Sequence, residues 1–224
     1  LKLAGEGAYE KAVKSVFGEL TFDDIIETVN ESLQQAAADF SGAINSQLRR
    51  LLDPIVIDLD GDGVELVAQS SSSVYFDMDG DGLKELTGWV GKDDALLAID
   101  ENSNGQIDSI VELIGDLLRS GFAELKTYDL ENDKIINSHD AVYSLLRVWV
   151  DANTDGITDA GELRTMAEAG IKAIDLNYTT VNFTAEGNRI HEQSQFEFTD
   201  GTTGTIADAW FDVSNVVTAS DSIE

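Results

Sequence analysis

The sequence predicts an α+β fold in which EF-hand-like calcium loops join short strands and helices. This core would be preceded by an α-helical leader and followed by a β-rich C-terminal part. Three observations predict it: apolar residues recur with a helical period before residue 52, acidic glycine-rich loops follow short apolar stretches from residue 54, and apolar residues alternate in parts of the chain after residue 171. The chain therefore divides into a leader (1–52) that ends an upstream region, a module (53–213) and a linker (214–224).

The leader is expected to hold a short helix at 6–17 and a long one that begins near Thr21. Apolar residues of the long helix keep a period of about 3.6 as far as Leu51. The long helix must end at Asp53, because a residue that precedes proline is pushed out of the α region. That proline, Pro54, is the only one in the chain.

Beyond Pro54 the stretches "PIVIDL", "VYFDM" and "LLAID" are typical of short strands, and each runs into a loop rich in Asp. Helices are predicted at about 108–119, 139–149 and 160–169. From Ile171 onward we expect strands, separated by turns at 186–188 and 199–201.

The charge balance excludes several classes of partner. Asp and Glu number 43 against 14 Lys and Arg, so the formal net charge is -29, and nucleic acid and anionic membranes would be repelled. No apolar stretch approaches the roughly 20 residues of a membrane span. Such an acidic chain needs cations to offset its self-repulsion, and without cysteine it has no disulfides to stabilise it. Ca²⁺ could both offset the charge repulsion and stabilise the fold, because it prefers hard oxygen ligands such as carboxylates.

Five loops carry the spacing of a calcium site. The best match to an EF-hand loop is "DANTDGITDAGE" (151–162), with glycine at its sixth position. The loop at 129–140 has Lys134 in place of that glycine, and the loops that begin at Asp58, Asp77 and Asp100 lack a standard twelfth ligand. About four to five Ca²⁺ are expected. The predicted ligands are Asp58, Asp60, Asp62, Glu65, Asp77, Asp79, Asp81, Glu85, Asp100, Asn102, Asn104, Gln106, Asp108, Glu112, Asp129, Glu131, Asp133, Ile135, Asn137, Asp140, Asp151, Asn153, Asp155, Ile157, Asp159 and Glu162.

The two histidines, His139 and His191, are far apart in the sequence, and no cysteine accompanies them. This pattern argues against a zinc site or a catalytic triad and favours surface or capping roles.

The ordered motifs "LDPIVIDLDGDGVELV", "FDMDGDGLKELTGWV", "DENSNGQIDSIVELIGD", "LLRVWVDANTDGITDAGEL" and "GIKAIDLN" resemble the self-processing module of Frp-type iron-regulated RTX proteins. The resemblance covers about 53–213. It implies a secreted or surface-exposed bacterial protein, exported by a type I route, in which calcium triggers autocatalytic cleavage of an Asp–Pro bond. Carried over, that bond is Asp53–Pro54, and the new C-terminal aspartate is then linked to a lysine.

The residues make this chemistry reasonable. The Asp53 carboxylate can attack its own backbone carbonyl carbon, close a five-membered ring and expel the prolyl nitrogen, which leaves a cyclic anhydride. Water opens the anhydride by hydrolysis, and a lysine amine opens it to an isopeptide bond. The acceptor is left open among Lys84, Lys92, Lys126, Lys134, Lys172 and lysines of other proteins, and no general acid is identified.

Two alternatives remain. The spacing of the loops at Asp129 and Asp151 also resembles dockerin repeats, which would make the chain a calcium-rigidified binding module. It could equally be a calcium-stiffened spacer of a surface adhesin. Neither alternative requires cleavage, and the sequence does not decide whether the parent protein is a toxin or an adhesin.

Overall fold

The structure is a computed structural model that describes residues 32–34, 53–115 and 119–218, with side chains as far as 214. The chain divides into two compact units, Leu1–Asn45 and Ser46–Glu224. In the first unit only the helical residues 32–34 are described, so the rest of the predicted leader lies outside the described residues. No helix of the described part is long and apolar enough to cross a membrane.

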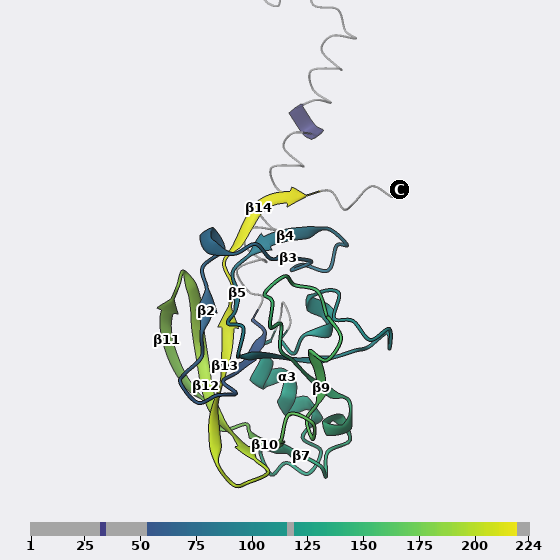
Figure 1. The fold of residues 1–224 in the computed structure, drawn as a ribbon, viewed down its shortest axis with the longest axis vertical. Helices are drawn as coiled ribbons and strands as arrows, with labels where there is room; N and C mark the ends of the chain where they lie inside the picture. The colour runs from purple at the N-terminus through teal and green to yellow at the C-terminus, as the bar shows by residue number, and fades with distance from the viewer. Residues whose placement is uncertain (1–31, 35–52, 116–118, 219–224) are drawn as a thin grey trace, which may run out of the picture. The chain divides into compact units, whose positions relative to one another are not determined.

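The predicted fold class is wrong, because the structure is mostly β-sheet, with 40% strand and 13% helix, and the main sheet curls into a half-barrel (Figure 1). Acidic loops of EF-hands lie between helices. Here most of the segments around the loops pair as strands, although a 3₁₀ turn follows the loop at Asp100 and a helix precedes the loop at Asp129. The strands are β1 (Ile55–Ile57), β2 (Leu66–Val67), β3 (Tyr75–Phe76), β4 (Lys84–Thr87), β5 (Trp89–Val90), β6 (Ala95–Ile99), β7 (Ile135–Asn137), β8 (Leu146–Trp149), β9 (Leu163–Thr165), β10 (Ile171–Asp175), β11 (Thr179–Ala185), β12 (Asn188–Phe198), β13 (Thr203–Trp210) and β14 (Val213–Thr218).

The three predicted helices of the module do not form. In the described part of 108–119 (108–115 and 119) the only such element is the 3₁₀ turn η3 (Ile110–Glu112), and 160–169 contain β9. Residues 139–149 hold the 3₁₀ turn η4 (Ala141–Ser144) and then β8, which is paired on both sides. Pairing in the sheet thus overrides the local helical pattern. The longest helix of the module is α3 (Gly121–Tyr128), and a further 3₁₀ turn is η2 (Gln69–Ser71).

The main sheet places β1 near its middle. Its strand order is β7-β10-β12-β13-β1-β6-β8-β9, with β11 added on β12. Because side chains alternate between the faces of a strand, Val56 joins one hydrophobic core while Ile55 and Ile57 join the other. The second core includes Phe122 and Leu125 of α3. All three residues of β1 are fully buried, so this strand is held firmly on both sides.

Two smaller sheets complete the unit: β14-β4-β3 and β2-β5. In the first, β14 pairs with β4, so the segment expected to be a linker from residue 214 begins as a paired strand. The predicted strands at 171–198 and their turns are confirmed as β10, β11 and β12. The hydrophobic alternation of this region is therefore a reliable guide, in contrast to the helical patterns.

Candidate functional site

The Asp53–Pro54 peptide is buried at the entry to β1. Asp53 is 3% exposed, although it is an acidic residue. The Pro54 carbonyl accepts a hydrogen bond from Ala209 N at 3.0 Å, and Ile55 N donates to the Ile114 carbonyl at 2.9 Å. The residues that follow the bond are therefore anchored on both sides.

Gly115 covers the carbonyl of this peptide. A Cβ atom at position 115 would overlap the Asp53 carbonyl oxygen and lie 2.7 Å from its carbon and 3.1 Å from Pro54 Cα. The backbone of Gly115 is left-handed (φ 126), and its N–H donates to Glu124 Oε2 of α3 at 2.9 Å. Only glycine fits this close approach without displacing the Asp53 carbonyl.

The strand register brings four side chains onto the face that Asp53 occupies, namely those of Ile55, Glu192, Asp208 and Trp210. Ile55 lies opposite Asp208 on β13, and Asp208 lies opposite Glu192 on β12. Opposite residues of an antiparallel pair project from the same face, as do residues two apart in one strand. Asp53 is thus on the Asp208 side, and its Oδ2 accepts a hydrogen bond from Trp210 Nε1 at 3.2 Å.

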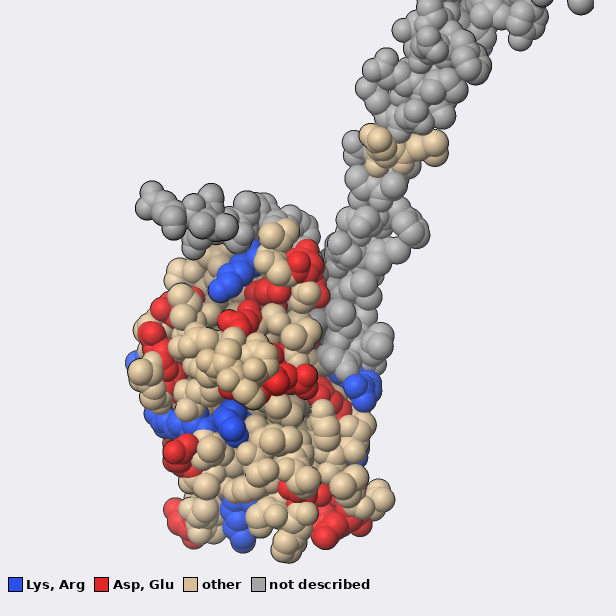
Figure 2. All heavy atoms as spheres, turned by 90° about the vertical axis from the view of Figure 1, so that its right-hand side faces the viewer, with Lys and Arg blue, Asp and Glu red and all other residues tan. Residues whose placement is uncertain are grey.

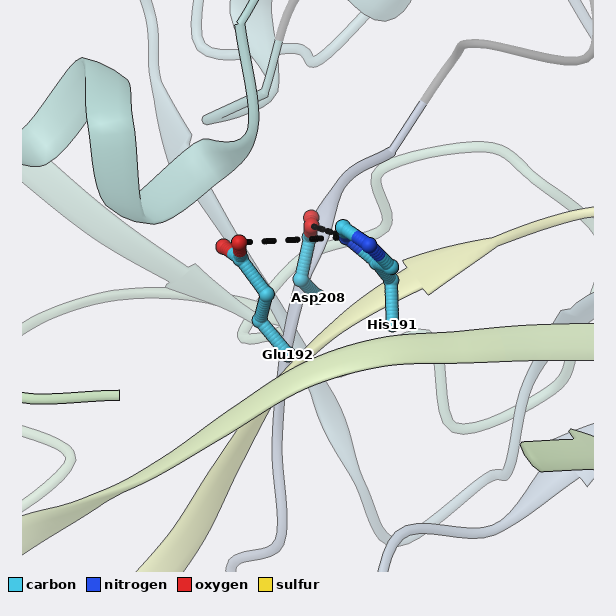
Figure 3. Close-up of side chains that lie close together, drawn as sticks. All are labelled: His191, Glu192 and Asp208. Carbon is cyan, nitrogen blue, oxygen red and sulfur yellow. Dashed lines mark ion pairs between the residues drawn. The ribbon is translucent and has the colours of Figure 1, made fainter. Parts of the chain in front are cut away.

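A β-bulge adds a histidine to this group. Between Ile190 and Glu192 the register of β12 against β13 shifts by one residue, so His191 is the extra residue. Its Nδ1 lies 3.8 Å from Glu192 Oε1 and 3.9 Å from Asp208 Oδ2 (Figure 3). The centres of the His191 and Trp210 rings are 5.2 Å apart. The sequence predicts a surface or capping role for His191. The structure adds that its side chain, which is 26% exposed, borders this group of carboxyls.

Burial dominates the electrostatics of the cluster. Asp208 is fully buried, and neither of its oxygens accepts a hydrogen bond of ordinary geometry. Desolvation and then the charge of Glu192 raise the pKa of Asp208 to about 8, while the Gly121 N–H, the Asp53 carboxyl and the Trp210 indole lower it in part. Asp208 therefore keeps a proton at neutral pH. On the far side, burial and then the charge of Glu192 raise the pKa of Tyr178.

The five acidic loops share one backbone conformation. In each, the first carboxylate accepts hydrogen bonds from the loop's own N–H groups, including that of the sixth residue: the donor–acceptor pairs are Gly63–Asp58, Gly82–Asp77, Gly105–Asp100, Lys134–Asp129 and Gly156–Asp151. The fourth and sixth residues of every loop have positive φ, namely Gly61, Gly63, Gly80, Gly82, Ser103, Gly105, Asn132, Lys134, Thr154 and Gly156. This turn aims the N–H groups of the loop at its first side chain, and in the loops at Asp58 and Asp77 oxygen atoms of the first and third carboxylates lie within 4.8 Å of each other.

The structure shows which further carboxylate lies beside the loops that begin at Asp58 and Asp77. Oxygen atoms of Asp77, Asp79 and Glu85 lie within 4.8 Å of one another, and Glu85 is fully buried. In the loop at Asp58 the third member of such a cluster is Asp94, which joins Asp58 and Asp60. Asp94 Oδ2 also accepts a hydrogen bond from Glu65 N at 2.6 Å.

The sequence predicts Glu65, not Asp94, as the additional ligand of the loop that begins at Asp58. That side chain is exposed and faces Asp93 and Asp62, which raise its pKa. Burial raises the pKa of Asp94 to about 7. No spacing rule selects Asp94, because it lies well outside the loop and reaches it only through tertiary folding.

In the other three loops the late carboxylates fold back onto the loop. Glu162 Oε1 accepts from Ala152 N and its Oε2 from Asp159 N, and Glu112 Oε2 accepts from Asp108 N. Asp140 Oδ2 accepts from Asn137 N in the loop that contains Lys134.

The remaining predicted ligands stand at the rims of these loops. Asp62, Asp81, Asn102, Asn104, Glu131, Asp133, Ile135, Asn153 and Ile157 are exposed or only partly buried. Gln106 donates weakly to the Gly105 carbonyl, and Asp155 and Asp159 accept from Asn153. The donor set consists of carboxylate, amide and backbone oxygens, which is the chemistry that Ca²⁺ requires, and the residues therefore fit this ion.

Acidic side chains form several separate groups on the face drawn in Figure 2, with few basic residues between them. Among the candidate acceptor lysines, Lys84 and Lys92 are exposed, and Lys172 pairs with Glu197 at 2.6 Å. Lys126 Nζ lies 4.1 Å from the ring centre of Tyr178 and so borders the Glu192 side of the cluster.

Comparison with known proteins identifies the family of the chain. A family model described as the SPM domain matches residues 55–212, and the chain belongs to this family. It is also similar to the "Iron-regulated protein FrpA" of Neisseria meningitidis serogroup C, with 44% identity over 166 residues. That alignment covers 70% of this chain but 15% of the relative, so the chain corresponds to a small part of that protein. The predicted resemblance is confirmed at the level of the family.

Proposed function

We propose that the chain cleaves its own Asp53–Pro54 bond when calcium is bound. The observation that carries the proposal is the place of this bond: the only proline of the chain follows a buried aspartate at the entry to a central strand whose other end opens into an acidic loop. An ordinary helix stop would have no reason to bury both residues beneath Gly115 and Trp210.

The Asp53 carboxylate is the nucleophile of the proposed reaction. It attacks the carbonyl carbon of its own residue, the bond to Pro54 N breaks, and a cyclic anhydride remains at residue 53. Trp210 holds one carboxyl oxygen, while Gly115 and the hydrogen bonds of Pro54 and Ile55 restrain the peptide. A prolyl nitrogen belongs to a tertiary amide, which twists more easily than a secondary one. Hydrolysis or linkage to a lysine amine then completes a single turnover.

Two of the acidic loops touch this peptide through short connections. Asp58 follows β1 directly, and Asp58 N donates to Thr205 O of β13 at 3.0 Å. On the opposite side, the segment after Glu112 reaches Ile114 and Gly115, which contact Ile55 and Asp53. When bound, Ca²⁺ would supply positive charge that offsets the repulsion of the loop carboxylates. Ordering of these two loops would fix both sides of the reacting peptide.

The location of the reaction follows from the same proposal. FrpA is named for iron regulation, and we place this chain likewise in a bacterial protein that is secreted or displayed on the surface. Extracellular calcium would then start the reaction after export, whereas the low calcium of the cytosol would keep the chain intact.

A denaturing gel tests the proposal. The purified chain is incubated with millimolar Ca²⁺ or with EGTA, and the products are identified by mass. Self-processing yields pieces 1–53 and 54–224 with calcium only, together with slower species if a lysine accepts the anhydride. A chain that binds calcium and stays whole would instead support the binding-module or spacer alternative.

A further inference from the structure

We propose that Asp208 is the general acid that protonates the prolyl nitrogen as the Asp53–Pro54 bond breaks. This inference rests on the proposed cleavage, and it assigns the proton donor that the reaction needs, since an amide nitrogen leaves poorly as an anion. His191 would connect this acid to solvent, and Glu192 would act as a positioning residue.

The register places Asp208 on the correct side of the bond. Asp53 precedes the nitrogen that leaves, Ile55 follows it, and Asp208 lies directly opposite Ile55 on β13. Ala209 N binds the Pro54 carbonyl at 3.0 Å, which fixes β13 against this peptide. The Asp208 and Asp53 side chains project from the same face and interact with each other. The carboxyl groups thus flank the breaking bond from one side.

The environment of Asp208 keeps its proton available. The carboxyl is fully buried, and the charged groups that face it are carboxyls: Glu192 from β12 and Asp53 from the segment before β1. The other polar groups around it are the Gly121 N–H of α3, the Trp210 indole, the Tyr178 hydroxyl and the neutral or protonated ring of His191. No Lys or Arg contact of Asp208 occurs among the described residues. A buried carboxyl among carboxylates stays protonated at neutral pH.

The step balances without a further reactant. The Asp53 carboxylate forms the new C–O bond, the C–N bond breaks, and its electron pair goes to Pro54 N, which takes the proton of Asp208. The products are the anhydride, a prolyl secondary amine and the Asp208 carboxylate. That carboxylate then accepts a proton from the water or lysine amine that opens the anhydride. Figure 3 shows how His191, which is partly exposed, points at both Asp208 and Glu192 and offers a path to solvent.

The pH dependence of cleavage tests the assignment on the full chain in saturating Ca²⁺. Because the pKa of Asp208 is about 8, the rate should be highest below that pH and fall as pH rises through it. Glu192→Gln removes a charge that raises this pKa, so the alkaline fall should move to lower pH. Asp208→Asn keeps the size but holds no transferable proton, and cleavage should slow by about 10² to 10⁴-fold.

The outcomes separate this inference from the proposed cleavage. If the parent chain does not cleave with calcium, the proposed function itself is wrong. If the parent cleaves and Asp208→Asn cleaves at the parental rate, Asp208 is not the acid. Should Asp208→Asn fail to fold by circular dichroism, the other two measurements decide: a parental rate that stays constant above pH 8, or an alkaline limb that Glu192→Gln does not move, overturns the assignment.

Discussion

The two ends of β1 carry acidic groups of opposite character. At the Asp58 end, the first carboxylate of the loop accepts hydrogen bonds from Gly61 N at 2.8 Å and Gly63 N at 3.2 Å. At the Asp53 end, Asp208 accepts none of ordinary geometry and has a pKa of about 8. In the sequence, Pro54 and the three residues of β1 separate Asp53 from Asp58, whereas Asp208 reaches the Asp53 end because β13 pairs with β1.

The difference lies in the backbone. A turn with two left-handed residues aims N–H groups at a carboxylate and stabilises its charged form, as a cation site needs. Paired strands use their N–H groups in the sheet, so a carboxyl buried between them has few donors and keeps its proton. Under the two proposals, the same residue type would therefore serve as an ion ligand at one end of β1 and as an acid at the other.

The largest effect is expected at the reacting end. Asp53→Asn removes the attacking carboxylate, and an amide is a much poorer nucleophile, so cleavage and cross-linking should both vanish. Calcium binding should persist, because Asp53 belongs to no loop. Mass spectrometry with calcium titration measures both. Asp53→Glu, which keeps a carboxyl but needs a larger ring, is the control and should be severely slowed. Cleavage of the Asn variant at the parental rate would identify another nucleophile.

The next effect is expected at the loop end. Asp94→Asn removes a carboxylate that converges with Asp58 and Asp60, so the calcium concentration for half-maximal cleavage should rise about tenfold or more. The adjacent Asp93→Asn is the matched control, because Asp93 faces Glu65 outside this cluster. A calcium titration followed on gels compares them. If the two variants need the same calcium concentration for half-maximal cleavage, Asp94 is not part of the calcium site.

An effect on the cleavage rate itself, rather than on the calcium requirement, is expected where the loop at Asp100 reaches the Asp53–Pro54 peptide. Gly115→Ala places a methyl group against the Asp53 carbonyl, and a displacement of about 1 Å should slow cleavage by about 10²-fold. Gly201→Ala is the control, since Gly201 also has a positive φ but nothing lies near its Cβ position. Single-turnover rates at saturating calcium measure the difference. If both variants cleave equally fast, the close approach of Gly115 does not matter for the reaction.

The smallest effect is expected in the loop with a lysine. Lys134 has a left-handed backbone (φ 66) where the other four loops have glycine. Lys134→Gly should stabilise the calcium-loaded form by about 1 kcal/mol, measured by urea unfolding in the uncleavable Asp53→Asn chain. Lys134→Gln removes the charge but keeps the Cβ, so it separates the electrostatic from the backbone contribution. A Gly variant no more stable than the Gln variant would contradict the strain argument.

The family, the five acidic loops and the strands after residue 171 were predictable from sequence. Acidic residues at alternate positions followed by a turn define a loop locally, and alternation of apolar residues defines a half-buried strand. Glu85 lies in one cluster with Asp77 and Asp79 and could be found from sequence because it is only a few residues beyond its loop; its role as a calcium ligand stays a prediction. The helices at 139–149 and 160–169 were wrong because pairing in the main sheet outweighs weak local periodicity. The helix at 108–119 was also wrong, since its described residues form only the 3₁₀ turn η3.

By itself, the sequence determined the position of the Asp–Pro bond and of the loops around it, because both depend on residues close together in the chain. Only the tertiary structure decided the partners of that bond. Asp94, Gly115, Asp208 and Trp210 reach their places through the strand register and the β-bulge at His191, and no local pattern encodes these. The raised pKa values of Asp94 and Asp208 likewise depend on burial, and this burial arises only when distant strands pair.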